Sequence, residues 1–255
     1  MTPGLSVSNL SCGYGRSHVV HGVTLPPLAP GSVTALIGPN AAGKSTLLRG
    51  LAGLSPARGS LTLDGQDLSR LSVLRRADLV GHMPQGVIDP VGMSVLDCVM
   101  IAMPHGSASR DEAALAHLAR HGADDLANSP VTRLSGGQRQ VLGLVLATAR
   151  DPRVLLLDEP TSALDMNRRH TVMSRVRDLA AEGRAALVVL HDLALAAQWA
   201  DHVAVLSHGR LHAFGPPADV ITPPMLRDVY RVAARVEPCS AGRLQIMIDG
   251  AIDLS

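Results

Sequence analysis

A short apolar run that ends in a glycine-rich loop constrains this chain more than any other feature. Residues 33–37 are mostly apolar, the next loop reads Gly38-x-x-x-x-Gly43-Lys44-Ser45, and residues 43–51 have the character of a helix. A strand, a loop and a helix in this order are the context in which a phosphate-binding loop is credible. Glycines let successive backbone N–H groups surround a phosphate, and the helix adds its positive end. The segment therefore predicts a nucleotide site.

Within this P-loop (residues 38–45) two side chains have expected roles toward ATP. Lys44 would reach the β- and γ-phosphates, and the Ser45 hydroxyl would ligate Mg²⁺. The bland alternative is a strand-to-helix turn with an ordinary surface lysine. The residues expected to bind the nucleotide here are Gly38, Pro39, Asn40, Ala41, Ala42, Gly43, Lys44, Ser45 and Thr46.

A second apolar run carries two carboxylates to its end. Residues 154–157 are all apolar and are followed by Asp158 and Glu159. Asp158 at the end of a buried strand can hold Mg²⁺ through water, and Glu159 can act as the general base that polarises the attacking water. Taken alone, such a pair is more often a helix N-cap, and Pro160 with the residues after it fits a helix start. The P-loop upstream favours the catalytic interpretation.

A second glycine-rich loop, the signature loop (residues 134–138), reads Leu-Ser-Gly-Gly-Gln and precedes a predicted helix at 138–150. Its hydroxyl, its backbone N–H groups and the helix N-terminus can form an anion site. The alternative is a common serine-capped helix start. The whole helical region separates this loop from the P-loop, so one phosphate is not easily reached by both loops of one chain.

The order of the predicted elements indicates an α/β fold. Residues 5–10, 19–25 and 59–63 have the pattern of strands, with Pro26, Pro27, Pro30 and Gly31 breaking the chain after the second. Helices are expected at 94–103, 110–121, 138–150 and around 168–181, and buried strands at 154–157 and 185–190. Residues 203–207 and 210–214 predict a hairpin. We expect a single domain, 1–255, with an antiparallel β subdomain and a helical insertion at about 86–150 in a parallel-sheet core.

Composition excludes several classes of partner. With 23 basic and 22 acidic residues, nothing suggests a nucleic-acid surface. Three distant cysteines argue against a disulfide framework or a zinc site. Every apolar run is far shorter than the roughly 20 residues of a membrane helix. If the chain serves a membrane, we expect it to dock onto another protein.

The P-loop, the signature loop and the Asp158-Glu159 strand together resemble the ATP-binding-cassette (ABC) ATPase family. The resemblance implies a P-loop NTPase core and a head-to-tail dimer, in which Ser135 and Gly137 of one subunit contact the γ-phosphate held by Lys44 of the other. The same loop contributes Gly136 and Gln138, and Asp165 belongs to the loop, residues 162–165, through which the two sites communicate.

The resemblance also implies roles for three isolated residues. His191 would contact the γ-phosphate and help hold the water, and Gln85 would touch Mg²⁺ and that water. Tyr14 would stack on adenine, although a hairpin tyrosine that covers a sheet edge is the alternative. The other histidines, including His105, His117 and His121, are expected at the surface. Ala41 stands where the family usually has glycine, and a positive φ there would strain it by on the order of 1 kcal/mol.

Residues 209–217 and 220–226 resemble the branch of the family that imports iron-siderophores, haem and cobalamin. This implies transmembrane permease subunits, indirectly a substrate-binding protein, and a peripheral position on the cytoplasmic face of the membrane. A soluble ABC ATPase without a transport function, such as one for cluster assembly, is the alternative.

Overall fold

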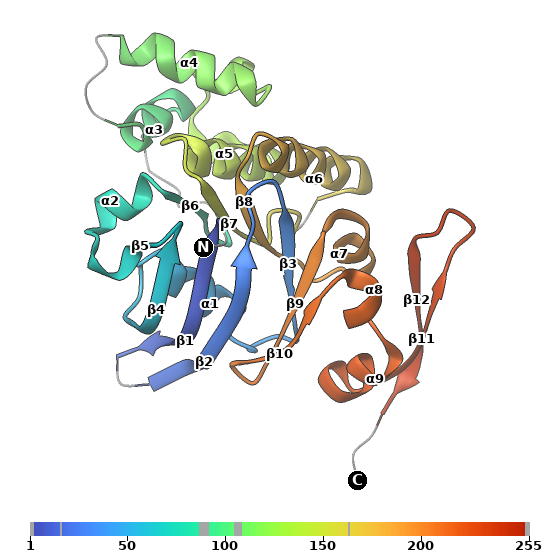
Figure 1. Ribbon diagram of the computed structural model, residues 1–255. Helices are drawn as coiled ribbons and strands as arrows, with labels where there is room; N and C mark the ends of the chain where they lie inside the picture. The colour runs from blue at the N-terminus through green and yellow to red at the C-terminus, as the bar shows by residue number, and fades with distance from the viewer. Residues whose placement is uncertain (1–2, 16, 87–91, 105–108, 163, 253–255) are drawn as a thin grey trace.

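The computed structural model describes residues 3–15, 17–86, 92–104, 109–162 and 164–252. Its centre is a six-stranded sheet in the order β10-β9-β3-β8-β7-β6 (Figure 1). All neighbours are parallel except β9 and β10, which form the predicted hairpin. The strands are β3 (Val33–Ile37), β6 (Val80–Met83), β7 (Val154–Asp158), β8 (Ala185–Val189), β9 (His202–Ser207) and β10 (Arg210–Gly215).

The central strands are continuous apolar runs because helices cover both faces of the sheet. Every residue of β3, β7 and β8 is buried. One face packs on α1 (Lys44–Leu51), the other on α6 (Met166–Ala181) and α7 (Leu193–Trp199). Neighbouring residues of β3 alternate between the two hydrophobic clusters, as the two-residue period of a strand requires.

A second, antiparallel sheet lies across α1 from the first, and both sheets share a hydrophobic cluster with this helix. Its order is β2-β1-β4-β5. The strands are β1 (Leu5–Tyr14), β2 (Ser17–Leu28), β4 (Ala57–Leu63) and β5 (Gln66–Asp67). The expectation that Pro26 and Pro27 end the second strand is wrong, because β2 continues to Leu28. It is an edge strand of this sheet, where a missing backbone N–H costs no ladder bond.

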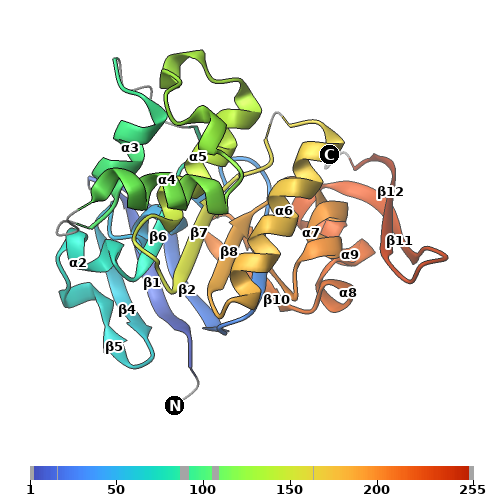
Figure 2. The same ribbon diagram turned by 90° about the horizontal axis from the view of Figure 1, so that it is seen from above.

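Three helices group together on one side of the six-stranded sheet: α3 (Val95–Ala102), α4 (Arg110–Arg120) and α5 (Gly136–Thr148), of which α5 also packs on β6 and β7 (Figures 1 and 2). They share a hydrophobic cluster of their own, which includes Val99, Leu118 and Leu142. We call them the helical layer. Short elements lie between the longer ones: η1 (Leu68–Arg70) and α2 (Val73–Ala77) join β5 to β6, and η2 (Asp124–Leu126) and η3 (Val131–Arg133) join α4 to α5.

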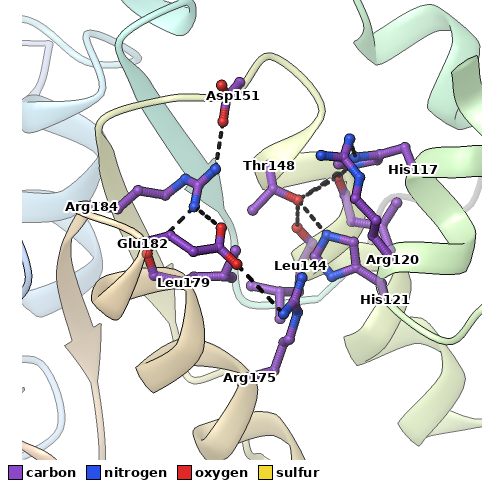
Figure 3. Close-up of polar contacts among 11 residues, drawn as sticks. His117, Arg120, His121, Leu144, Thr148, Asp151, Arg175, Leu179, Glu182 and Arg184 are labelled. Carbon is purple, nitrogen blue, oxygen red and sulfur yellow. Dashed lines mark hydrogen bonds and ion pairs between the residues drawn. The ribbon is translucent and has the colours of Figure 1, made fainter.

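Two histidines of the helical layer contradict the surface expectation. His117 is only 3% exposed and His121 is half-buried, while His105 lies outside the described residues. Figure 3 shows both rings turned toward Thr148 at the end of α5. The Thr148 hydroxyl oxygen lies 3.3 Å from His117 Nε2 and 3.0 Å from His121 Nε2. The two positions are four residues apart, on one side of α4 and its C-cap, and that side is the buried one.

The chain ends in a segment for which the sequence predicted no elements. It contains α8 (Pro217–Val220), α9 (Pro223–Met225), a π-helical turn η4 (Leu226–Tyr230) and a hairpin of β11 (Val232–Pro238) with β12 (Leu244–Ala251). We call residues 216–252 the C-terminal segment. None of the helices in the described ranges is long and apolar enough to cross a membrane.

Candidate nucleotide site

A pocket of about 720 Å³ opens where the P-loop leaves the sheet. It brings together residues from the P-loop and the start of α1, from β1 and β2, and from the segments that follow β6, β7 and β8. The lining residues are Tyr14, Val19, Asn40, Ala41, Ala42, Gly43, Lys44, Ser45, Thr46, Gln85, Glu159 and His191. All but Val19 were expected from the sequence. Val19 lies on β2 and carried no motif that could have identified it.

The P-loop backbone is shaped by its glycines. Gly38 has φ 150°, and a Cβ there would lie 2.1 Å from the Leu206 carbonyl oxygen of β9, so no other residue fits. Gly43 has φ 100° and is the N-cap of α1, which has no side-chain cap. The first N–H groups of α1 therefore face the pocket without a protein side chain to satisfy them, which suits a phosphate.

Lys44 is buried at the base of the pocket, with 6% of its surface exposed. Its Nζ donates to the carbonyl oxygens of Gly38 at 2.8 Å and Pro39 at 2.9 Å. Burial lowers the pKa of Lys44, while the carboxylates of Glu159 and Asp158 oppose that shift. The cation is thus held at the start of the loop and faces the two acidic residues.

Asp158 has the surroundings expected of a magnesium ligand. Burial raises its pKa, the nearby Glu159 adds to that shift, and a hydrogen bond from Ser45 and the charge of Lys44 oppose it. Its Oδ1 is buried and has no hydrogen-bond partner among the described residues. No group of three or more His, Cys, Asp or Glu side chains suited to a metal occurs in that part of the chain. This donor set of one carboxylate and one hydroxyl fits Mg²⁺, which takes its other ligands from water and phosphates.

Glu159 is contacted by two polar side chains. Gln85 Nε2 donates to its Oε2 at 2.9 Å, and His191 Nε2 lies 2.5 Å from its Oε1. Glu159 itself has φ 53°, a left-handed conformation that is uncommon outside glycine. Such outliers gather at functional sites. The sequence separation of these three residues is large, yet the sheet brings them to one edge because β6, β7 and β8 end there.

Two further expectations concern the rim of the pocket. Ala41 has φ 63°, so this position does require the left-handed backbone that favours glycine. Tyr14 is 52% exposed, and the Arg49 guanidinium carbon lies 5.9 Å from the centre of its ring. One face of the ring is therefore near a cation, and the exposed part of the ring is available for stacking.

The signature loop does not line this pocket. The Ser135 hydroxyl accepts from the Gln138 backbone N–H at 3.3 Å, and Gln138 Oε1 accepts from the Ser135 N–H at 2.9 Å. This is a capping box at the start of α5. A Cβ on Gly137 would lie 2.7 Å from Arg168 of α6, whereas Gly136 is exposed and has open space around it. Asp165 caps α6 in turn, and Ala163 before it lies outside the described residues.

Comparison with known proteins supports the nucleotide site. Residues 23–162 match the family model described as ABC transporter. The chain is 41% identical to the Hemin import ATP-binding protein HmuV of Pseudomonas entomophila over 92% of this chain and 95% of that protein. It is 40% identical to the protein of the same name from Pseudomonas aeruginosa, over 91% and 94%.

Solved structures give the same result. An inward-facing metal-chelate type ABC transporter superposes with a TM-score of 0.79 at 25% identity, covering 98% of both chains. The ATP-binding subunit of another ABC transporter gives 0.74 at 27%, covering 85% of this chain and 91% of that chain. The chain therefore belongs to the ABC transporter family, as one of its ATP-hydrolysing subunits.

Proposed function

We propose that this chain energises the import of haem, or of a related iron-siderophore or cobalamin compound, from the cytoplasmic face of a membrane. The identity to two haemin import proteins over more than nine-tenths of the chain carries this proposal. The chain would work with transmembrane permease subunits and, indirectly, with a substrate-binding protein. Among the three substrates, haem is favoured because it is named for these relatives.

In the proposed reaction the P-loop N–H groups and Lys44 bind the phosphates of ATP. Ser45 and Asp158 would hold Mg²⁺, which neutralises charge on the β- and γ-phosphates. Glu159 accepts a proton from the attacking water, and Gln85 and His191 orient it. Both carboxylate oxygens of Glu159 are engaged in this structure. Each oxygen keeps a further lone pair, so a water in the pocket can still bond the base beside these two residues.

We also propose that the second half of each site comes from a second copy of the chain. The capped Ser135 and the exposed Gly136 of the signature loop lie outside the pocket of their own chain. ATP would close the head-to-tail dimer because its γ-phosphate contacts both subunits, and hydrolysis would release it. Asp165, at the start of α6, would lie in the loop that joins the two sites.

Glu159→Gln tests the catalytic part of this proposal. The amide keeps the size of the carboxylate but cannot accept the proton, so ATP turnover should be nearly abolished while ATP holds the chain as a dimer. Steady-state phosphate release and size-exclusion chromatography with MgATP measure the two effects. A variant that hydrolysed normally, or stayed monomeric with ATP, would refute the assignment.

Deletion of the gene tests the substrate. Growth is compared on haem, on ferric siderophores and on cobalamin as supplied nutrients, with complementation by the wild-type chain and by Lys44→Ala. We expect the deletion strain to lose growth on haem but not on the other two compounds. Only the wild-type chain should restore growth on haem. Unaltered use of all three compounds would overturn the importer branch.

Copurification from native membranes tests the partner. Recovery of a multispanning permease with the chain supports a transport role, whereas recovery of a soluble scaffold alone refutes it.

A further inference from the structure

A second cavity, of about 240 Å³, lies at the opposite end of α1 from the nucleotide pocket. The first residues of α1 line the nucleotide pocket, whereas Gly50 and Gly53 line this cavity, and the two share no lining residue. Ser55 and Arg76 also line it, and we call it the Arg76 cavity. A water molecule takes about 30 Å³ in the liquid, so the cavity has room for a ligand of several non-hydrogen atoms.

The guanidinium of Arg76 is buried at this cavity. Arg76 belongs to α2 and has 8% of its surface exposed. Its Nη2 donates to the Leu68 carbonyl oxygen of η1 at 2.5 Å. A Cβ on Gly53 would lie 2.7 Å from Nη1 and 3.0 Å from Cζ, so glycine at this position makes room for the head group. The cation is thus held between η1 and the end of α1.

This buried cation has no counter-ion in contact with it. In the part of the chain that the structure describes, Arg76 forms no ion pair, and its buried Nε has no hydrogen-bond partner. Burial lowers the pKa of Arg76 and the charge of Asp67 opposes that shift, but an arginine keeps its proton in a protein. Asp67 itself bonds the Ser69 hydroxyl at 2.6 Å and Arg70 Nε at 3.1 Å. A buried charge without a partner is costly, so the site favours an anion.

A second polar atom at the cavity also lacks a partner. The Ser55 Oγ is buried and makes no hydrogen bond within the described ranges. Buried polar atoms are almost always bonded, and those that are not require an explanation such as a bound water or ion. Ser55 comes from the connection between α1 and β4, whereas Arg76 comes from α2. Two separate segments therefore bring one unpartnered donor each to the same cavity.

We propose that the Arg76 cavity binds a small carboxylate with a short aliphatic chain. The carboxylate accepts from Arg76 Nε and from the Ser55 hydroxyl, and its single charge balances the guanidinium. The aliphatic chain lies against the apolar walls, which Leu10, Leu61 and Leu71 form. A phosphate has no apolar part to place against these walls. The site lies outside the ATP reaction proposed above and does not depend on it.

Nuclear magnetic resonance of the arginine Nε–H groups tests the site, because it observes the unpartnered atom itself. The Arg76 signal is identified by its absence in Arg76→Gln. Sodium butyrate should shift this signal in the wild type until it saturates, while sodium chloride at the same ionic strength should not. Acetate lacks two methylenes and should bind more weakly, by up to about 4-fold for each of them. 1-Butanol, which has the chain without the charge, should leave the signal in place.

Titration calorimetry with butyrate compares three variants with the wild type. Arg76→Gln should show no binding, and Arg75→Gln, on the exposed side of the same helix, is the matched control and should bind as the wild type does. Because the loss of Arg76 also removes the bond to Leu68 and can disturb α2, Ser55→Ala is the second test. It leaves Arg76 in place and should raise the Kd for butyrate roughly 10-fold. An Arg76 signal that butyrate does not shift, an unchanged Kd in Ser55→Ala or in a folded Arg76→Gln, or tighter binding of inorganic phosphate than of butyrate would overturn the inference.

Discussion

Replacing His121 with glutamine tests whether the buried and half-buried histidines of the helical layer make the fold sensitive to acid. His117 Nε2 lies 2.9 Å from the Val145 carbonyl oxygen, which can only accept, so this nitrogen carries a proton. Its Nδ1 lies 3.0 Å from an Arg120 guanidinium nitrogen, which can only donate. His117 is therefore neutral, and its tautomer is fixed. A glutamine at position 121 can still bond Thr148 but cannot become charged.

The magnitude follows from the pKa of His121, which is lowered from 6.5 to about 3. Burial is the main cause, and the nearby His117, Arg175, Arg120 and Arg184 add to it. Between these pH values the unfolded chain binds a proton that the folded chain does not. Above pH 6.5 His121 therefore does not lower the free energy of unfolding, and this free energy falls as the pH drops below 6.5. At pH 5 the lowered pKa corresponds to a decrease of about 2 kcal/mol in the free energy of unfolding. Because solvent screens the half-buried ring, we expect about 1–2 kcal/mol.

Urea unfolding at pH 7.5 and pH 5, followed by circular dichroism, measures this difference. The single tryptophan, Trp199, is a poorer probe because its ring lies 5.0 Å from that of His170. Between the two pH values the free energy of unfolding should fall by about 1–2 kcal/mol more in the wild type than in His121→Gln. His18→Gln on the exposed part of β2 is the control and should lose as much as the wild type. The reasoning fails if the free energy of unfolding of His121→Gln falls as much between the two pH values as that of the wild type.

Two substitutions test other parts of the fold. Ala41→Gly should raise the free energy of unfolding by up to about 1 kcal/mol, because glycine relieves the strain of a φ of 63° but adds entropy to the unfolded chain; a lower melting temperature would contradict this. Leu118→Ala, at a side chain with 0% exposure in the cluster of the helical layer, should cost about 2–5 kcal/mol. Urea unfolding measures it, with Leu115→Ala on the exposed side of α4 as the control. A loss under about 1 kcal/mol would show that the helical layer is loosely packed.

Patterns that act over a few residues predicted most of the architecture. The apolar run of β3, the glycines of the P-loop and the serine before α5 each specify their own local structure. The resemblance to ABC ATPases then predicted that Gln85, Glu159 and His191 meet, which no local pattern could do. Fold and pocket agree with both expectations, while the roles of the individual residues await the tests above.

The features that the sequence did not predict depend on contacts between distant segments. His117 and His121 follow the helical period of α4, and that period fixes only that they share a face. Whether the face is buried depends on α5, which supplies Thr148 (Figure 3). The C-terminal segment likewise carries no motif that predicts its elements, and Met225, Leu226 and Val229 join the cluster of Ile37 only because this segment folds back on β3.

The engagement of Glu159 has a consequence for regulation. Gln85 and His191 bond one carboxylate oxygen each, so the same two residues that should orient the attacking water also fix the orientation of the base in the single chain. The two contacts differ in how they can be released. Both side chains are exposed, but His191 directly follows the buried Leu190 at the end of the sheet, whereas Gln85 begins the connection from β6 to the helical layer. A rotation of the helical layer would therefore displace Gln85 first, which frees one oxygen of Glu159 while His191 keeps the other in place. We expect hydrolysis to depend on the position of the helical layer for this reason, and Gln85→Ala should weaken that dependence more than it weakens ATP binding.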